Sequence, residues 1–234
     1  MKTLALLSLL LAPILGTQQK PAAPPAAGSS AELGTVLTEM DKRAATFKSA
    51  QADFEWDNYQ KVMDETYKQT GRVYFRRNGT DVEAMFDIIE PHAKQVLFKG
   101  GKLFLYDKKT DQLTEHKTQN KADVEAFLSL GFGAPGQDLP KNYDVKMDGW
   151  ETADGMRVAK LELVSKSEKV RNMFTKFILW IDPQRDVPLK QQVLEPGDDY
   201  WLSHYTNFKL DGKIPDDIFR IKTTSHTRVV TVDQ

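Results

Sequence analysis

One arginine stands where a hydrophobic side chain would be expected. Residues 71–77, GRVYFRR, alternate as a half-buried strand does, so Val73, Phe75 and Arg77 share one face. A guanidinium carries five donors on a planar head, which suits several backbone carbonyl groups at once. Alternatively, the stem of a strand-end arginine packs against the protein while its head stays in water. The strand pattern alone leaves both interpretations of Arg77 open.

The other residue types that could do chemistry show no recognisable spacing. His92, His116, His204 and His226 lie far apart without an HExxH pattern, so neither a metal site nor a cofactor is expected. A nucleophile elbow, a phosphate loop and a dinucleotide fingerprint are also missing. We therefore expect a protein that is not an enzyme. Carboxylates that converge from distant strands would leave no local signature, so an enzyme acting on lipid or glycan stays an alternative.

Composition limits the compartment and the class of partner. The 32 basic and 33 acidic residues nearly balance, which argues against a nucleic-acid groove. Residues 1–16 have the anatomy of a secretory signal peptide, with Lys2 before an apolar run. Residues 17–30 are a Pro/Ala-rich segment that predicts a disordered spacer. The chain has no cysteine, so it lacks both disulfides and the residue that anchors a bacterial lipoprotein. We expect an exported, soluble protein.

The remaining residues, 31–234, are expected to form a single domain rich in strands. Ser29 and Glu32 form a capping box before a helix whose apolar stripe runs to Phe47. A second short helix is predicted over residues 120–131. Elsewhere the period is 2, and Gly100-Gly101 predicts a tight hairpin turn. The predicted strands cover residues 52–56, 71–77, 82–89, 96–107, 112–116, 143–147, 157–165, 173–182, 189–194, 200–210 and 227–232.

About ten or eleven strands, all antiparallel, and two short helices make a mainly β (α+β) protein. Two helices cannot cover both faces of so large a sheet, so we expect the sheet to curl into an unclosed barrel with helices over its open side. A barrel this wide can enclose a ligand. The alternative is that inward aromatic side chains simply fill it.

Four pieces in order resemble the outer-membrane lipoprotein carrier (LolA-like) family over about 200 residues. They are the Gly71–Arg77 strand, the hairpin GGKLFLYD at residues 100–107, FLSLG at residues 127–131, and Asn207 through Phe219 with KIPD at residues 213–216. The chain departs from the family pattern in two places. Asn78-Gly79 follows the arginine in place of proline, and TTSHT at residues 223–227 replaces a Pro-rich strand end.

The resemblance implies an unclosed antiparallel barrel with a helical lid over a hydrophobic cavity. It also implies a periplasmic carrier that shuttles acylated lipoproteins from the inner to the outer membrane. The implied partners are an inner-membrane lipoprotein-releasing ABC transporter and an outer-membrane receptor, and the carrier itself is expected to be monomeric. In the family, the arginine that matches Arg77 bonds to lid carbonyl groups and holds the empty cavity shut, so Arg77 is expected to be a lid latch.

Period and position give the side chains that we expect to line the cavity. Ordinary core packing is the alternative for each of them. The predicted lining residues are Leu37, Met40, Phe54, Trp56, Val73, Phe75, Phe86, Ile88, Leu103, Leu105, Phe127, Leu128, Met173, Phe177, Leu179 and Ile181. Besides a carrier and an enzyme, a lipid-binding or signalling module on the same fold stays a third functional class.

Overall fold

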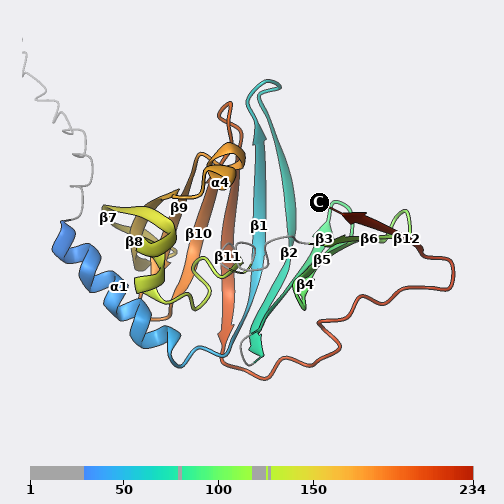
Figure 1. The fold of residues 1–234 in the computed structure, drawn as a ribbon, viewed down its shortest axis with the longest axis horizontal. Coiled ribbons are helices and arrows are strands. Elements are labelled where there is room, and N and C mark those ends of the chain that lie inside the picture. Colours follow the sequence, from blue (N-terminus) through green and yellow to red (C-terminus); the bar gives the residue numbers. More distant parts are fainter. Residues whose placement is uncertain (1–28, 79–80, 118–124, 126–127, 234) are drawn as a thin grey trace, which may run out of the picture.

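The computed structural model describes residues 29–78, 81–117, 125 and 128–233. In these residues twelve strands form one curved sheet, one or two more strands than we expected, with helices against one face (Figure 1). The sheet order is β12-β6-β5-β4-β3-β2-β1-β11-β10-β9-β8-β7. The elements are α1 (Ser30–Ala44), β1 (Ser49–Gln60), β2 (Glu65–Asn78), β3 (Asp81–Glu90), β4 (Lys94–Lys99), β5 (Lys102–Asp107), β6 (Gln112–Lys117), η1 (Gly136–Asp138), α3 (Leu139–Asn142), β7 (Tyr143–Ala153), β8 (Met156–Ser165), α4 (Glu168–Met173), β9 (Lys176–Asp182), β10 (Val187–Leu194), β11 (Tyr200–Leu210) and β12 (Arg228–Asp233).

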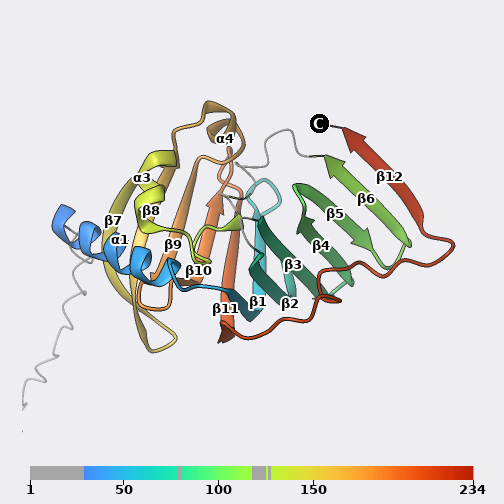
Figure 2. The ribbon, with the colours of Figure 1, turned by 60° about the horizontal axis from the view of Figure 1, so that its bottom comes forward.

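The sheet is unclosed, with β7 at one edge and β12 at the other (Figure 2). Ten of its neighbouring pairs are antiparallel, but β12 runs parallel to β6, with Arg228 opposite Gln112 and Val232 opposite His116. The expectation of antiparallel pairing throughout was therefore wrong. Residues 211–227 carry the chain from the end of β11 to β6, where β12 adds to the sheet.

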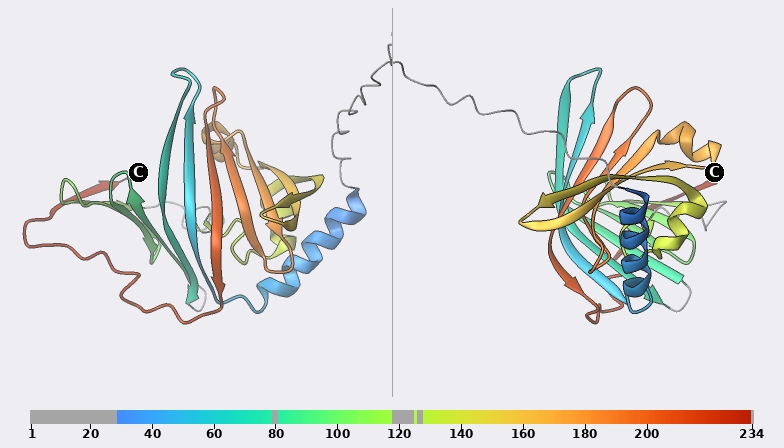
Figure 3. Two further views of the ribbon diagram at one scale, coloured as in Figure 1. Left: turned by 180° about the vertical axis from the view of Figure 1, so that it is seen from behind. Right: turned by 90° about the vertical axis from the view of Figure 1, so that its left-hand side faces the viewer.

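The predicted first helix is confirmed as α1. The Ser29 hydroxyl accepts a hydrogen bond from the Glu32 amide at 3.2 Å, and the Glu32 carboxylate accepts one from the Ser29 amide at 2.8 Å. The helix ends at Ala44, so Phe47 lies in the connection to β1. Val36, Leu37 and Met40 are its buried residues, and the helix lies across the curved sheet on the side of β7 (Figure 3).

Two strand boundaries differ from the prediction in instructive ways. β2 begins at Glu65 rather than Gly71, because hydrogen bonding to β1 continues through a stretch with little apolar alternation. Residues 168–173 form the short helix α4, so the strand predicted from Met173 begins only at Lys176. The hairpin predicted at Gly100-Gly101 is confirmed, with φ of 59° and 75°. The predicted helix over residues 120–131 falls mostly outside the described residues.

The two faces of the sheet are covered by different parts of the chain. We call the face that carries α1 the concave face and the opposite one the outer face. Residues 211–227, here named the strap, cross the outer face between β11 and β12 (Figure 1). Phe219, Ile214, Ile218 and Ile221 of the strap pack there against Tyr74, Met85 and Leu97.

Arg76 links a buried glutamate of the sheet to an exposed aspartate of the strap. The Arg76 guanidinium bonds Glu83 at 2.5 Å and Asp216 at 2.6 Å, and it lies 4.3 Å from the centroid of the Phe219 ring. Lys99 adds a second cation, 3.1 Å from Glu83. The neighbouring arginines of β2 thus point to opposite faces of the sheet. Arg76 contacts the strap on the outer face, and Arg77 points to the concave face.

Candidate functional site

The concave face is apolar along most of its width, and its side chains form two clusters. In the first cluster, α1 packs on the strands β7–β9. Five of the predicted lining residues belong to this group, which we call the α1 cluster: Leu37, Met40, Phe177, Leu179 and Ile181. All five are buried, so in this conformation they contact one another and their neighbours.

The second cluster lies on β1–β5, and we name it the Phe132 cluster after a residue at its centre. Eight predicted lining residues belong to it. Phe54, Val73, Phe75 and Ile88 are buried in it, and Trp56, Phe86, Leu103 and Leu128 are half-buried against it. Phe54 stacks on Trp56 with ring centroids 4.4 Å apart, and Trp56 is 5.2 Å from Phe86.

The three other predicted lining residues differ. Leu105 points to the concave side, opposite Val96, but 39 % of its surface is exposed. Met173 is 48 % exposed because it ends α4 rather than starting a strand. Phe127 lies outside the described residues. That the sixteen residues line a cavity for a ligand stays a prediction.

A short segment covers the concave face where the two clusters meet, and we call residues 128–135 the lid segment (Figure 2). Its Phe132 ring is 3 % exposed, stacked at 5.8 Å on Phe75 and edge-on at 5.3 Å to Tyr205. On the other side of the segment, Leu130 enters the α1 cluster. The lid segment therefore inserts one large side chain into each cluster.

Glycines allow the lid segment to pack closely against its neighbours. Gly133 has φ of +69°, and a Cβ there would meet the Phe47 ring at 2.4 Å. At Gly131, with φ of +80°, a Cβ would lie 3.0 Å from Pro188. Both positions require a left-handed backbone that glycine adopts without strain. The close contacts of the lid segment with Pro188 and Phe47 depend on these two glycines.

Arg77 reaches the lid segment, as the latch hypothesis requires. Its Nη2 donates a hydrogen bond to the Gly133 carbonyl oxygen. The side chain bonds this carbonyl rather than several, and its Nε is buried with no hydrogen-bond partner. The alternative of a head held only in water is therefore wrong. The peptide group on the other side of Gly133 is held too, because the Gly133 amide donates to the Asp186 carbonyl oxygen at 3.1 Å.

Asp186 is an unusual residue at this position. Its side chain is fully buried, and neither carboxyl oxygen has a hydrogen-bond partner. Burial raises the pKa of Asp186 to about 8, although the charges of Arg43 and Arg77 act to lower it. The carboxyl group is therefore mostly protonated and neutral at pH 7.

Sequence reasoning missed three of the residues that define this site. Phe132, Gly133 and Asp186 all lie outside the helices and strands that we predicted. A usable signal was present for the first two, since LGFGAPG alternates glycine with large apolar residues in a way that a solvated loop does not need. Asp186 gave no signal, because aspartate is common in turns.

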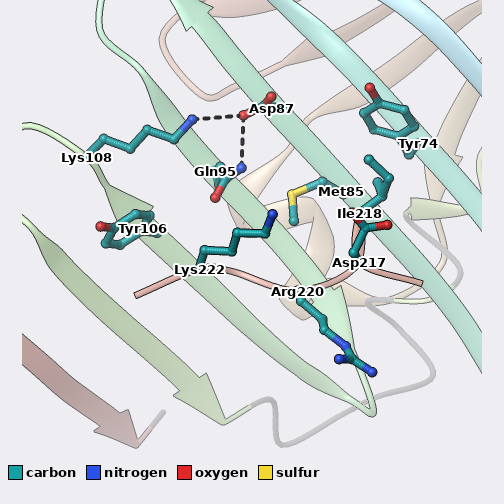
Figure 4. Close-up of a pocket in the computed structure, with 10 residues that line it drawn as sticks. All are labelled: Tyr74, Met85, Asp87, Gln95, Tyr106, Lys108, Asp217, Ile218, Arg220 and Lys222. Carbon is teal, nitrogen blue, oxygen red and sulfur yellow. Dashed lines mark hydrogen bonds and ion pairs between the residues drawn. The ribbon is translucent and has the colours of Figure 1, made fainter. Parts of the chain in front are cut away.

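Two cavities among the described residues are lined by none of the sixteen side chains predicted to line a lipid cavity, although Arg77 contributes to one of them. One, of about 190 Å³, lies beside Arg77 and the lid segment, with Ser129, Leu130 and Pro135 in its wall. The other, of about 470 Å³, lies on the outer face under the strap (Figure 4). There Gln95 and Lys108 both donate hydrogen bonds to Asp87, and the Lys108 cation offsets part of its charge.

Helices of the described residues are all too short or too polar to cross a membrane.

Comparison with known proteins gives a family and a fold. A family described as "Outer membrane lipoprotein carrier protein LolA" matches residues 45–222. An uncharacterized protein of Methanocaldococcus jannaschii is 27% identical over 125 residues, which is 53% of this chain and 34% of that protein. The chain thus spans about a third of the archaeal relative.

Two solved structures share the fold at low sequence identity. An uncharacterized conserved protein of Thermus thermophilus is 15% identical, with a TM-score of 0.54 over 87% of this chain and 100% of that one. MucB, known also from a Pseudomonas aeruginosa MucA/MucB complex, is 15% identical, with a TM-score of 0.53 over 86% of this chain and 66% of that one. At this identity the likeness concerns the fold alone. The family match covers most of the described domain, and the protein belongs to the LolA family.

Proposed function

We propose that this protein is a periplasmic carrier of acylated proteins, and that it takes their acyl chains onto the concave face under the lid segment. It would receive a lipoprotein from an inner-membrane ABC transporter and pass it to an outer-membrane receptor. Membership of the LolA family supports this proposal. The role is one of binding and release, with no catalytic step assigned to the chain.

The observation that carries the proposal is the position of Phe132. Its ring occupies the centre of an apolar cluster, yet it belongs to a lid segment rather than to the sheet. Gly133 ties that segment to β2 through Arg77 and to the turn before β10 through Asp186. A side chain held in this way can leave as a unit with its segment, and the space it vacates is apolar.

The energies involved suit reversible binding. Burying about twelve methylenes of an acyl chain would gain about 10 kcal/mol. Withdrawing Phe132 forfeits contacts that, in cores, are worth about 3–5 kcal/mol for a phenylalanine. Ordering the acyl chain takes away a further part of the gain. The net free energy of binding is therefore several kcal/mol smaller than the gain from burial alone, so a receptor can remove the cargo.

The test uses a fluorescent triacylated lipopeptide as the ligand and the same peptide without acyl chains as the reference. Phe132→Ala removes the ring that must be withdrawn, so its affinity should rise by about tenfold or more. Phe219→Ala is the matched control, because Phe219 is equally buried but lies on the outer face. It should lose comparable stability in urea and keep the wild-type affinity.

Two results would count against the proposal. Wild-type protein that binds the acylated and the plain peptide equally would show that acyl chains are not recognised. Equal changes of affinity in the two phenylalanine variants would show that Phe132 does not occupy the binding site. Native mass spectrometry of protein from the periplasm gives an independent check, since a bound protein without acyl chains would favour the alternative of a signalling module.

A further inference from the structure

Two buried polar groups near the lid segment have no hydrogen-bond partner, and one belongs to an acidic side chain while the other belongs to a cationic one. One is the carboxyl group of Asp186, and the other is Nε of Arg77. Leaving such groups unpaired in a protein interior costs free energy, about 1–3 kcal/mol for each. A structure that leaves both unpaired around one lid residue, Gly133, calls for an explanation.

Gly133 separates the two residues. Its carbonyl oxygen accepts the hydrogen bond of Arg77, and its amide donates to the main chain of Asp186. The lid segment thus bonds both residues while their charged ends stay unpaired with each other. If Gly133 moves away, the guanidinium loses its acceptor and the carboxyl group loses its cover at the same moment.

The charged groups around Asp186 leave Arg77 as the available cation. From α1, Asp41 and Arg43 act on the carboxyl group, but Arg43 is engaged by Asp211 at 2.5 Å and by Thr46 at 3.1 Å. In the turn of Asp186 itself, Arg185 pairs with Asp182 at 2.6 Å. Glu125 lines the cavity beside Arg77.

The turn geometry does not require an acid here. Asp186 has φ of 54°, a conformation that asparagine and glycine also adopt readily. Its amide bonds the Asp182 carbonyl oxygen at 2.8 Å whatever the side chain is. The backbone of this turn would therefore accept an uncharged side chain equally well, and it gives no reason for a buried acid.

We propose that Asp186 is a positioning residue for lid opening: when the lid segment leaves, the Arg77 guanidinium moves from the Gly133 carbonyl oxygen to the Asp186 carboxylate, and this ion pair holds the site open. The inference rests on the lid movement of the proposed function. It gives Arg77 two acceptors, one for each state.

Opening is then linked to the loss of one proton. In the closed state the pKa of Asp186 is raised to about 8. In the open state the carboxyl group is paired with Arg77, so its pKa lies at or below the ordinary value near 3.8. The pKa of Asp186 is higher in the closed state than in the open state, so protonation of Asp186 favours the closed state. This contribution is complete at low pH and is lost as the pH rises through about 8. Between the two pKa values, the opening equilibrium should increase by up to about tenfold per pH unit.

The Gly133 amide reports this equilibrium directly, because its hydrogen bond to Asp186 exists only in the closed state. Its protection factor, measured by solvent-exchange NMR between pH 5 and 8 and corrected for intrinsic exchange, should fall by up to about tenfold per unit. The amide of Leu161 in β8 should keep a constant protection factor. Asp186→Asn mimics the protonated group, so it should abolish the pH dependence and raise protection at pH 7 at least tenfold. Asp64→Asn is the matched control, an aspartate with φ of 52° at the far tip of a hairpin.

The direction of the change separates this role from a merely structural one. If Asp186 only supported the closed fold, Asp186→Asn would lower the protection of Gly133, and that result would overturn the proposal. In an Arg77→Gln background, Asp186→Asn should change opening by less than it does in the wild type. An equal change in both backgrounds would show that Arg77 is not the partner. These measurements use no lipid, so a protein that fails to bind lipopeptide could still show the switch, and the two failures are distinguishable.

Discussion

Replacing Gly133 with alanine should push the lid segment off the concave face. Two effects combine at this position. A non-glycine residue in the left-handed region loses about 1–2 kcal/mol. In addition, the new methyl group would lie 2.4 Å from the buried Phe47 ring, and overpacking of this kind costs about 1–3 kcal/mol. The two effects together destabilise the closed state by about 2–5 kcal/mol. They oppose the contacts that hold the lid segment closed, which are the buried side chains of Phe132 and Leu130 and the two hydrogen bonds of Gly133.

Gly155→Ala is the control that separates the steric clash from the backbone strain. Gly155 has φ of +74°, close to the +69° of Gly133, but a Cβ there meets nothing within 4 Å. Both variants carry the same backbone strain, and only Gly133→Ala carries the clash. The difference between them in the free energy of unfolding should therefore be about 1–3 kcal/mol.

The decisive assay is exposure of the concave face. Gly133→Ala should bind an apolar dye such as ANS and exchange the amides of residues 130–134 rapidly, while its strands stay protected. Gly155→Ala should do neither. If the two variants lose equal stability and neither exposes the face, then Phe47 yields to the methyl group, and the idea of a lid that must lie against the sheet is refuted.

Three further perturbations test other contacts. Arg77→Leu should weaken the closed empty state, so that lipopeptide binds but transfers poorly to acceptor membranes; transfer at the wild-type rate would contradict the latch. Arg76→Leu leaves the buried Glu83 with Lys99 as its one cationic partner and should lower the free energy of unfolding in urea by about 3–5 kcal/mol. The strap should become sensitive to trypsin, while the affinity for lipopeptide should not change. Hydroxyl groups of Thr227, Thr224 and Tyr106 lower the pKa of Asp111, so their stabilising contacts are complete above its ordinary value near 3.8 and lost as pH falls below it. The protection factors of the β12 amides, corrected for intrinsic exchange, should therefore be lower at pH 3 than at pH 6, and unchanged protection would show that the Asp111 carboxylate does not stabilise β12.

The strands and α1 were predictable because their signals are local. The capping box of Ser29 and Glu32 fixed one helix end, and period 2 assigned Val73, Phe75 and Arg77 to one face. Side chains at alternate positions must share a face wherever the strand is regular. The same local rule could not say what covers each face.

The long-range contacts were not predictable for a physical reason. The strap carries Ile214, Ile218 and Phe219, which read as an apolar segment that could cover either face. Its choice of the outer face, and the parallel pairing of β12 that follows, depend on where β11 ends and on Arg76. Burial of Asp186 is likewise a property of the assembled lid and turn, since nothing in residues 182–186 themselves removes water.

The place of β12 has a consequence for the order of assembly. Among the described elements this strand is the last to be synthesised, yet it protects the edge of β6, which is near the middle of the chain. Until those residues arrive, β6 offers unpaired backbone groups, and the apolar patch around Met85 and Leu97 lacks its cover. Until the strap and β12 have been synthesised, the chain therefore exposes both an unpaired strand edge and an apolar patch, and a product that ends before residue 211 would keep both exposed.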